Sequence, residues 1–260
     1  MQSSLSRGLA VAAALCVLAA GCAGQKPAAG PEQSPAEVYA RLLGPNQGLS
    51  TMRAVVEAQL SYAGRRISLP GVLLLDSLGG FRLDLLDPLD RPVAMIYSEG
   101  GRIVQYRPGT GVAASLGVFP GDCRGVVPED WVAAVLASSS GPPAGESLAI
   151  RSFWRDRVLE RRRDGALRES VRFREEAGGP TPRTYLWYCG EEDPVLQMQV
   201  RGSAEAAGRR MPGAFEVSYL KAGLTVSLQL REVESNPSLA STPVRPRLAD
   251  GTNWTSWRLP

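Results

Sequence analysis

The sequence predicts a mainly β protein, an incomplete antiparallel β-barrel of about ten or eleven strands with short lid helices. Three observations support this fold class: apolar and polar residues alternate over many short segments, glycine-rich turns separate these segments, and only two stretches show helical spacing. A sheet with one apolar face must curl or be covered, and two short helices cover little of it. We therefore expect an apolar cleft between sheet and helices, with a fully packed interior as the alternative.

The first 21 residues have the features of a bacterial signal peptide. Arg7 precedes an apolar stretch from Leu9 to Ala20, which is too short to span a bilayer comfortably and is expected to be removed. The stretch runs into Leu18-Ala19-Ala20-Gly21-Cys22, which resembles the bacterial lipobox. Cys22 is therefore the expected lipidation site, and its two or three acyl chains would anchor the protein to a membrane. The alternative is an ordinary cleavage site that happens to precede a cysteine.

Composition predicts how the rest of the chain is organised. Residues 22–34 form the lipid anchor and a flexible spacer, since the spacer is too poor in apolar bulk to order itself. Residues 35–234 form one domain, and residues 235–260 form a proline-rich tail. Trp254 and Trp257 are the candidate residues for docking this tail on the domain. Under the sorting rule of enteric bacteria, alanine rather than aspartate after Cys22 indicates the periplasmic face of the outer membrane.

The first half of the domain is expected to be a helix followed by a meander. The helix covers residues 35–43, with Ser34 as its cap. Five strands then lie between residues 52 and 106. The apolar face of the first strand comprises Met52, Ala54, Val56, Ala58 and Leu60. Because Pro70 has no N–H to donate, the second strand is expected to bend there or to lie locally at an edge.

The second half is expected to return to strands after a break. Residues 109–127 are predicted to be irregular, and Pro128-Glu129-Asp130 opens a helix that ends near residue 138. Strands resume near Leu148. They continue through the segments 167–174, 184–189, 195–201, 215–219 and 224–231.

The composition excludes several classes of function. The chain has no histidine, so Ser-His-Asp and Cys-His catalysis are excluded, and we predict neither a metal site nor a cofactor. Arginines are interleaved with acids rather than gathered in a stripe, so no nucleic-acid partner is expected. For Arg161-Arg162-Arg163 a solvated strand end is favoured over a phosphate site. In an oxidising compartment Cys123 and Cys189 either form a disulfide or remain separately buried thiols.

One stretch of sequence resembles a known family. After the signal peptide, lipobox and helix come Gly48-Leu49-Ser50-Thr51-Met52-Arg53-Ala54, the segment Gly71–Leu75 and the segment Phe81–Val93. This order resembles the LolA/LolB lipoprotein-carrier superfamily, in particular LolB-like outer-membrane lipoproteins, over residues 36–138. The resemblance implies an incomplete barrel, lidded by helices, whose concavity accepts lipoprotein acyl chains. It also implies that Leu89, in a turn between strands, contacts the membrane, with a core leucine as the alternative.

The predicted function is a non-catalytic, membrane-anchored lipoprotein that binds the acyl chains of lipid or lipoprotein for outer-membrane lipoprotein localisation. Its expected partners are the membrane, these acyl chains and a periplasmic carrier protein. The candidate cleft residues are Phe81, Leu83, Leu85, Met95 and Tyr97. The alternative is that these side chains are simply part of the hydrophobic core. An enzyme would depend on carboxylate groups such as Asp84 with Asp87, or Glu191-Glu192-Asp193. The remaining alternative is an envelope-assembly or scaffold lipoprotein with a filled interior.

Overall fold

The computed structural model describes residues 33–43, 48–99, 101–117, 130–136, 144–153, 155–190, 192–206, 209–239, 243–246, 248 and 252–257. The chain divides into two units, Met1–Ser34 and Pro35–Pro260. All the described helices and strands and the whole described core belong to the second unit, so this unit has what it needs to fold on its own. The predicted signal peptide, Cys22 and nearly all of the spacer lie outside the described residues.

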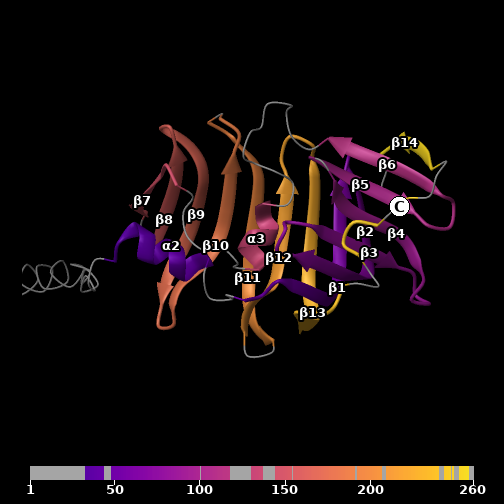
Figure 1. Cartoon of the computed structure of the whole chain (residues 1–260), viewed down its shortest axis with the longest axis horizontal. Helices are drawn as coiled ribbons and strands as arrows, with labels where there is room; N and C mark the ends of the chain where they lie inside the picture. The colour runs from indigo at the N-terminus through magenta and orange to yellow at the C-terminus, as the bar shows by residue number, and fades with distance from the viewer. Residues whose placement is uncertain are drawn as a thin grey trace, which may run out of the picture. The chain divides into compact units, whose positions relative to one another are not determined.

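The second unit is built on one open, curved sheet (Figure 1). Fourteen strands pair in the order β14-β6-β5-β4-β3-β2-β1-β13-β12-β11-β10-β9-β8-β7. All neighbours are antiparallel except β14 and β6, which are parallel. Because β14 and β7 are both edges, the sheet does not close within the described residues. The predicted mainly β class and the incomplete barrel are confirmed, although there are more strands than the ten or eleven expected.

The strands are numbered along the chain, so β1 lies beside β13 in the middle of the sheet. The first six are β1 (Thr51–Tyr62), β2 (Arg65–Asp76), β3 (Phe81–Leu86), β4 (Pro92–Glu99), β5 (Arg102–Arg107) and β6 (Val112–Gly117). The next four are β7 (Glu146–Phe153), β8 (Asp156–Arg163), β9 (Ala166–Glu176) and β10 (Gly179–Tyr188). The last four are β11 (Pro194–Ala206), β12 (Arg209–Tyr219), β13 (Leu224–Ser235) and β14 (Asn253–Ser256).

Alternation along β1 positions the core as the sequence predicts. Met52, Ala54, Val56, Ala58 and Leu60 are each at most 1% exposed, so they form one buried face. On β2, pairing with β3 ends at Gly71 and Leu85, whereas Pro70 pairs only with Glu57 of β1. The expected local edge at Pro70 is therefore confirmed.

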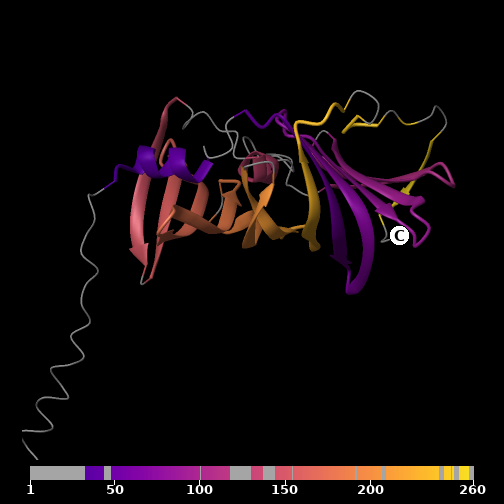
Figure 2. The ribbon, with the colours of Figure 1, turned by 90° about the horizontal axis from the view of Figure 1, so that it is seen from below.

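Two short helices cover the core-bearing face of the sheet, which we call the inner face (Figure 2). Helix α2 (Pro35–Leu43) has the predicted bounds and packs on β7, β8 and β10 through the buried side chains Val38, Tyr39, Leu42 and Leu43. Helix α3 (Asp130–Leu136) packs against β12 and β2. None of the helices in the described part of the chain is long and apolar enough to cross a membrane.

The C-terminal segment covers part of the opposite, outer face. Leu74, Tyr97 and Val104 are aligned across β2, β4 and β5, are at most 1% exposed and do not belong to the inner core. Val244 is also buried, and the guanidinium of Arg82 donates to the carbonyl of Pro243 at 3.0 Å. The tail thus closes a small second core over β3.

Candidate functional site

An apolar cleft lies between α2 and α3, and we call it the helix cleft. Its volume is about 430 Å³. The helices contribute Ala40, Arg41 and Leu42 from α2 and Ala134 and Val135 from α3. The sheet contributes Gly178, Pro180, Thr181, Pro182 and Tyr185 near β10, Met198, Val200, Gly202 and Ser203 from β11, and Met211 and Pro212 from β12.

The helix cleft lies where two neighbouring strands separate. Strand β10 pairs with β11 only from Thr184, opposite Gln199, onward. Before that point β10 pairs with β9 alone, with a register shift between Pro182 and Thr184. Pro180 and Pro182 have no N–H to donate, so they cannot extend the ladder towards β11. The sequence therefore opens the sheet at this place, and the separated edges line the cavity.

The floor of the helix cleft is a rigid aromatic and thioether surface. Tyr185 is 1% exposed and stacks on Trp187 with ring centroids 5.7 Å apart. Burial, and next the charge of Glu169, raise the pKa of Tyr185 far above its usual range. The tyrosine therefore stays neutral at physiological pH. Met198 and Met211, which are also fully buried, lie beside it in the lining, so the floor of the helix cleft is apolar.

Of the described residues that line the helix cleft, Arg41 is the one that carries a charge. Its side chain is exposed, and its guanidinium lies directly against Gly179, where an added Cβ would collide with Nη2. No carboxylate of the described residues forms an ion pair with it. The cleft therefore combines an apolar wall with a single cation at its rim.

The five predicted cleft residues do not line one cavity. Phe81, Leu83 and Leu85 lie on the inner face, where Leu83 pairs with Ile96 and Leu85 with Ala94. Met95 and Tyr97 pair with Asp84 and Arg82 and so lie on the outer face. Successive side chains of a strand point to opposite faces of the sheet, so an error of one residue along β4 assigns a side chain to the wrong face. The sequence pattern did not fix the register of β4. None of the five borders the helix cleft.

The inner-face residues of β3 belong to filled core. The ring of Trp131 on α3 lies 5.2 Å from that of Phe81 and 5.5 Å from that of Phe215, and its Nε1 donates to the Tyr219 hydroxyl at 3.0 Å. The space left there, bordered by Phe81 and Leu83, is about 10 Å³. That volume holds at most one water molecule. A ligand role for these residues stays a prediction, because the space beside them is too small for a ligand.

Leu89 lies at the tip of the β3–β4 turn. It is 72% exposed, so the alternative of a core leucine is wrong. Asp87 fixes this turn, because its carboxylate accepts from the N–H groups of Leu89 at 2.8 Å and Arg91 at 3.0 Å. The side-chain hydrogen bond from Arg91, followed by the backbone hydrogen bonds, lowers the pKa of Asp87. Membrane contact by Leu89 stays a prediction.

The carboxylates considered for catalysis have structural partners. Asp84 accepts two hydrogen bonds from Arg82, at 2.7 and 2.9 Å, and Asp87 serves its turn. Glu191 lies outside the described residues, whereas Glu192 and Asp193 are exposed. Within the described part of the chain no group of His, Cys, Asp or Glu is placed to hold a metal ion.

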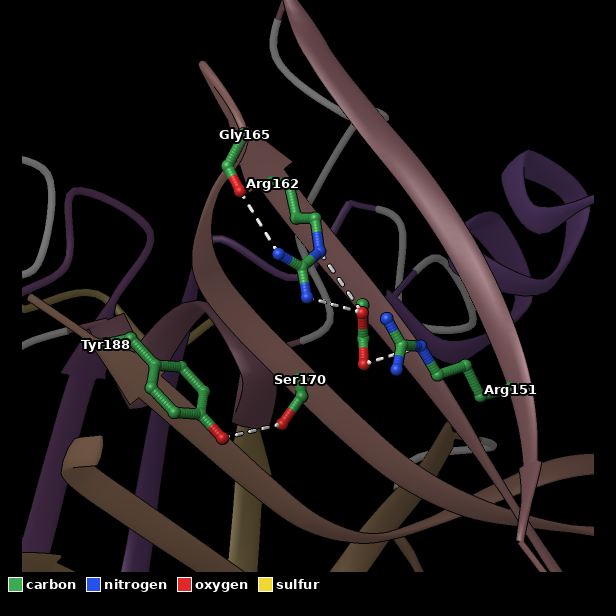
Figure 3. Close-up of polar contacts among 6 residues, drawn as sticks. Arg151, Arg162, Gly165, Ser170 and Tyr188 are labelled. Atoms are coloured by element: carbon green, nitrogen blue, oxygen red, sulfur yellow. Dashed lines mark hydrogen bonds and ion pairs between the residues drawn. The ribbon is translucent and has the colours of Figure 1, made fainter. Parts of the chain in front are cut away.

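The three consecutive arginines of β8 are all paired with glutamates. Figure 3 shows the outer-face part, where Glu160 accepts from Arg162 at 3.0 and 3.2 Å and pairs with Arg151 at 3.1 Å. Arg163 pairs with Glu146 at 2.8 Å. Because each guanidinium already has a carboxylate, the cluster is not arranged for phosphate. Arg161, however, is only 16% exposed, so it does not lie at a solvated strand end.

Arg161 lies at the centre of a buried ion-pair network on the inner face. It contacts Glu169 and Glu146, each at 2.8 Å, and Glu169 is fully buried. Burial opposes the charge of Arg161, but Glu169 and Glu146 raise its pKa above the usual range. Burial raises the pKa of Glu169, although Arg161 works against this shift. Tyr39 of α2 lies close enough to influence Arg161, so the network stands under the helix that walls the cleft.

The tail and cysteine predictions have mixed outcomes. Of the two tryptophans expected to dock the tail, Trp257 is 6% exposed and packs edge-on against Tyr62 with ring centroids 6.4 Å apart, whereas Trp254 is 56% exposed. Cys189 is disulfide-bonded. Cys123 lies outside the described residues, so its pairing with Cys189 stays a prediction.

Sequence reasoning missed the residues that make the helix cleft. A signal was present, since Gly178-Gly179-Pro180-Thr181-Pro182 places two prolines at alternate positions just before a strand. Such spacing removes two donors from the same edge and predicts a strand that cannot pair on that side. Which neighbour it separates from depends on strand order, which the local pattern does not contain.

Comparison with known proteins identifies the fold. No protein family and no curated protein matches the sequence at a significant level. Among solved structures, a domain from Vibrio parahaemolyticus, named as an outer membrane lipoprotein-sorting protein domain, has a TM-score of 0.51 and 12% identity over 80% of this chain and 94% of that one. A DUF1329 family protein from Desulfovibrio piger has a TM-score of 0.51 and 9% identity over 81% and 98%. A LolA superfamily protein from Nitrosomonas europaea has a TM-score of 0.46 and 10% identity over 78% and 93%.

The first two matches show which fold this chain shares. Each covers about four fifths of the chain and nearly all of the solved domain, so the likeness extends over the sheet rather than over one motif. The matches do not single out the LolB-like subgroup that the sequence resembles. The chain thus shares the fold of these two solved proteins, an open curved antiparallel sheet with short helices on its inner face.

Proposed function

We propose that this protein is a membrane-anchored lipoprotein that binds acyl chains in the helix cleft and serves the localisation of lipoproteins at the outer membrane. The observation that carries the proposal is the open apolar cavity of about 430 Å³ between α2, α3 and the separated strands β10 and β11. Small-molecule sites usually have volumes of about 300–1,000 Å³ and mainly apolar walls. The domain named for lipoprotein sorting in Vibrio parahaemolyticus has the same fold, which supports a carrier role.

The energetics of burial favour an acyl chain as the occupant. Each methylene removed from water contributes about 0.8 kcal/mol. If a methylene takes up about as much space as a water molecule in the liquid, about 30 Å³, the cleft holds roughly one chain of fourteen carbons. Burial of even half of such a chain offsets a large part of the cost of association. The cleft is therefore large enough to bind one chain of ordinary length.

The remaining parts of the proposal concern the membrane. Lipid on Cys22 anchors the chain to the periplasmic face of the outer membrane, and the spacer up to residue 34 tethers the domain. Leu89, held outward by Asp87, contacts the bilayer when cargo is passed on. A periplasmic carrier protein delivers the cargo. These roles follow from the sequence motif and the exposed turn, and each has its own test below.

A scaffold without a ligand is the competing function. The packing of Trp131 into the β3 side of the interior favours it, because that half of the inner face is filled. The two functions differ in one measurable property, which is whether the helix cleft takes up an acyl chain.

The test uses two neighbouring alanines of α3. Ala134 lines the helix cleft, whereas Ala133 is exposed and does not line it. The unit 35–260 is titrated with a fluorescent fatty-acid probe and then with unlabelled competitor. Ala134→Trp puts an indole into the cleft and should lower probe affinity at least tenfold, while Ala133→Trp should leave it unchanged.

Two results would count against acyl binding. One is a wild-type domain that neither binds the probe nor co-purifies with lipid by mass spectrometry, which would favour the scaffold. The other is equal affinity for the Ala134→Trp and Ala133→Trp variants, which would place the probe elsewhere. Circular dichroism of both variants controls for folding.

A further inference from the structure

The charge at the rim of the helix cleft indicates which kind of head group the cargo carries. Among the lining residues whose side chains the structure describes, Arg41 alone carries a charge, and none of them is a carboxylate. The other polar lining side chains are Thr181, Ser203 and the neutral Tyr185. A purely hydrocarbon ligand would leave the guanidinium without a function at this place.

The position of Arg41 is set by the turn between β9 and β10. Gly179 has a φ of 112°, a conformation that favours glycine, and a Cβ there would collide with Nη2 of Arg41. Gly178 and Pro180, on either side of Gly179, both line the helix cleft. The glycine therefore lets the guanidinium lie across the turn at the border of the cavity.

Glu176, the acid that ends β9, has other partners. Glu176 accepts from the Thr181 hydroxyl at 3.0 Å and pairs with Arg183 at 2.9 Å. Arg41 itself forms no ion pair with a described carboxylate. A guanidinium that has no ion pair with a described carboxylate can donate two parallel hydrogen bonds to the two oxygens of a ligand carboxylate.

We propose that the helix cleft binds a free fatty acid, with its single chain between α2 and α3 and its carboxylate on Arg41. The inference rests on the proposed acyl-binding function and narrows its cargo. The volume suits one chain, and one guanidinium balances the single negative charge of a carboxylate. A phosphate monoester carries about −1.5 to −2 at neutral pH and would leave charge uncompensated. A zwitterionic head group would need an anion that the described lining residues do not supply.

The experiment compares three ligands on the unit 35–260 and its variants by probe displacement at pH 7.5. The ligands are palmitate, monopalmitoylglycerol and palmitoyl lysophosphatidate, which share a chain and differ in head group. Arg41→Ala should weaken palmitate about tenfold and leave monopalmitoylglycerol unchanged, since a charge-assisted pair contributes to one ligand only. The matched control is Arg65→Ala, which removes an exposed arginine at the β1–β2 turn. It should change neither affinity.

The outcomes separate this inference from the function on which it rests. If Arg41→Ala weakens palmitate and monopalmitoylglycerol equally, or neither, the carboxylate assignment is overturned while acyl binding stands. If lysophosphatidate binds more tightly than palmitate and depends on Arg41, the head group is a phosphate and the assignment is again overturned. If wild-type protein binds none of the three, the proposed function itself fails. Arg41→Lys should restore part of the palmitate affinity, because lysine carries the positive charge but cannot donate the two parallel hydrogen bonds of a guanidinium.

Discussion

Glu169 is a buried carboxyl group whose ionisation affects the stability of the inner face. It is fully buried beside Arg161 and near Trp187, and it shares Arg161 with Glu146. Burial is the largest influence on Glu169 and raises its pKa above the 4.5 of an unperturbed glutamate. The folded protein therefore takes up a proton on Glu169 more readily than the unfolded chain does. The stability that this uptake contributes is fully present below about pH 4.5 and is lost as pH rises through the folded-state pKa.

We predict that Glu169→Gln changes the pH dependence of stability in a defined direction. Glutamine cannot ionise, so the free energy of unfolding of the wild type minus that of the variant should be larger at pH 5 than at pH 7.5. Urea denaturation at both pH values measures the difference, in which all other carboxylates cancel. An equal or smaller difference at pH 5 would show that Arg161 outweighs burial.

At the tip of the β3–β4 turn, Leu89 provides a second test at the residue scale. Leu89→Glu should reduce binding of the unit 35–260 to lipid vesicles, because an exposed apolar side chain is replaced by a charge. The thermal midpoint should stay the same, since the side chain makes little contact with the core. The matched control is Leu78→Glu, because Leu78 is 89% exposed at the opposite end of β3. Equal vesicle binding of Leu89→Glu and the wild type in co-sedimentation would refute membrane contact.

Helix α3 is the element that divides the inner face into a filled half and an open half. Trp131 fills the space over β3 and β12, while Ala134 and Val135, one turn on, face the helix cleft. Trp131→Ala should therefore lower the free energy of unfolding by about 3–5 kcal/mol, as expected when a large buried side chain leaves a cavity. Trp131→Phe keeps most of the apolar contact and loses the hydrogen bond to Tyr219, so it should cost about 1 kcal/mol.

Urea denaturation of both Trp131 variants checks this prediction. A loss below about 1 kcal/mol for Trp131→Ala would mean that α3 does not pack as described. Probe binding to Trp131→Ala is informative as well, since removal of the indole enlarges the apolar space next to the helix cleft.

Elements were predictable where the local pattern alone determines them. Strand β1 alternates strictly, and α2 has a cap and one apolar face, so both were found with nearly correct bounds. Strand β6 (VAASLG) and strand β14 (NWTS) were not expected. Both segments are short and lack a clear alternation of apolar and polar residues, and they are strands because the edge of the sheet offers them partners. Tertiary context decided these two elements.

The same distinction explains why the site was harder to predict than the fold. Phe81, Leu83 and Leu85 were correctly expected on an inner apolar face, but a strand pattern does not tell filled core from open cavity. That difference depends on where α3 lands and on the separation of β10 from β11. Both are contacts between distant segments. Arg41 and the prolines of β10 become a site only when the helix and the strand lie side by side.

On the scale of the whole molecule, the proposed function joins a lipid tether at Cys22 to a domain with a lipid-binding cleft. Cys22→Ser removes the thiol that we propose to be acylated, and two or three acyl chains hold a protein on a membrane far more firmly than one. The variant should therefore move from the membrane fraction to the soluble fraction, with the fold of the unit 35–260 unchanged. Membrane fractionation of the full-length variant equal to that of the wild type would exclude the lipobox assignment.

Photo-crosslinking tests the central claim most directly. The unit 35–260 is irradiated with a palmitate analogue that carries a photoreactive group near the chain end, and the labelled peptides are mapped by mass spectrometry. We predict label on the residues that wall the helix cleft, above all Ala134, Met198 and Met211, with loss of label in excess palmitate and in Ala134→Trp. Label confined to other surfaces, or label that excess palmitate does not displace, would contradict an acyl-binding cleft between α2 and α3.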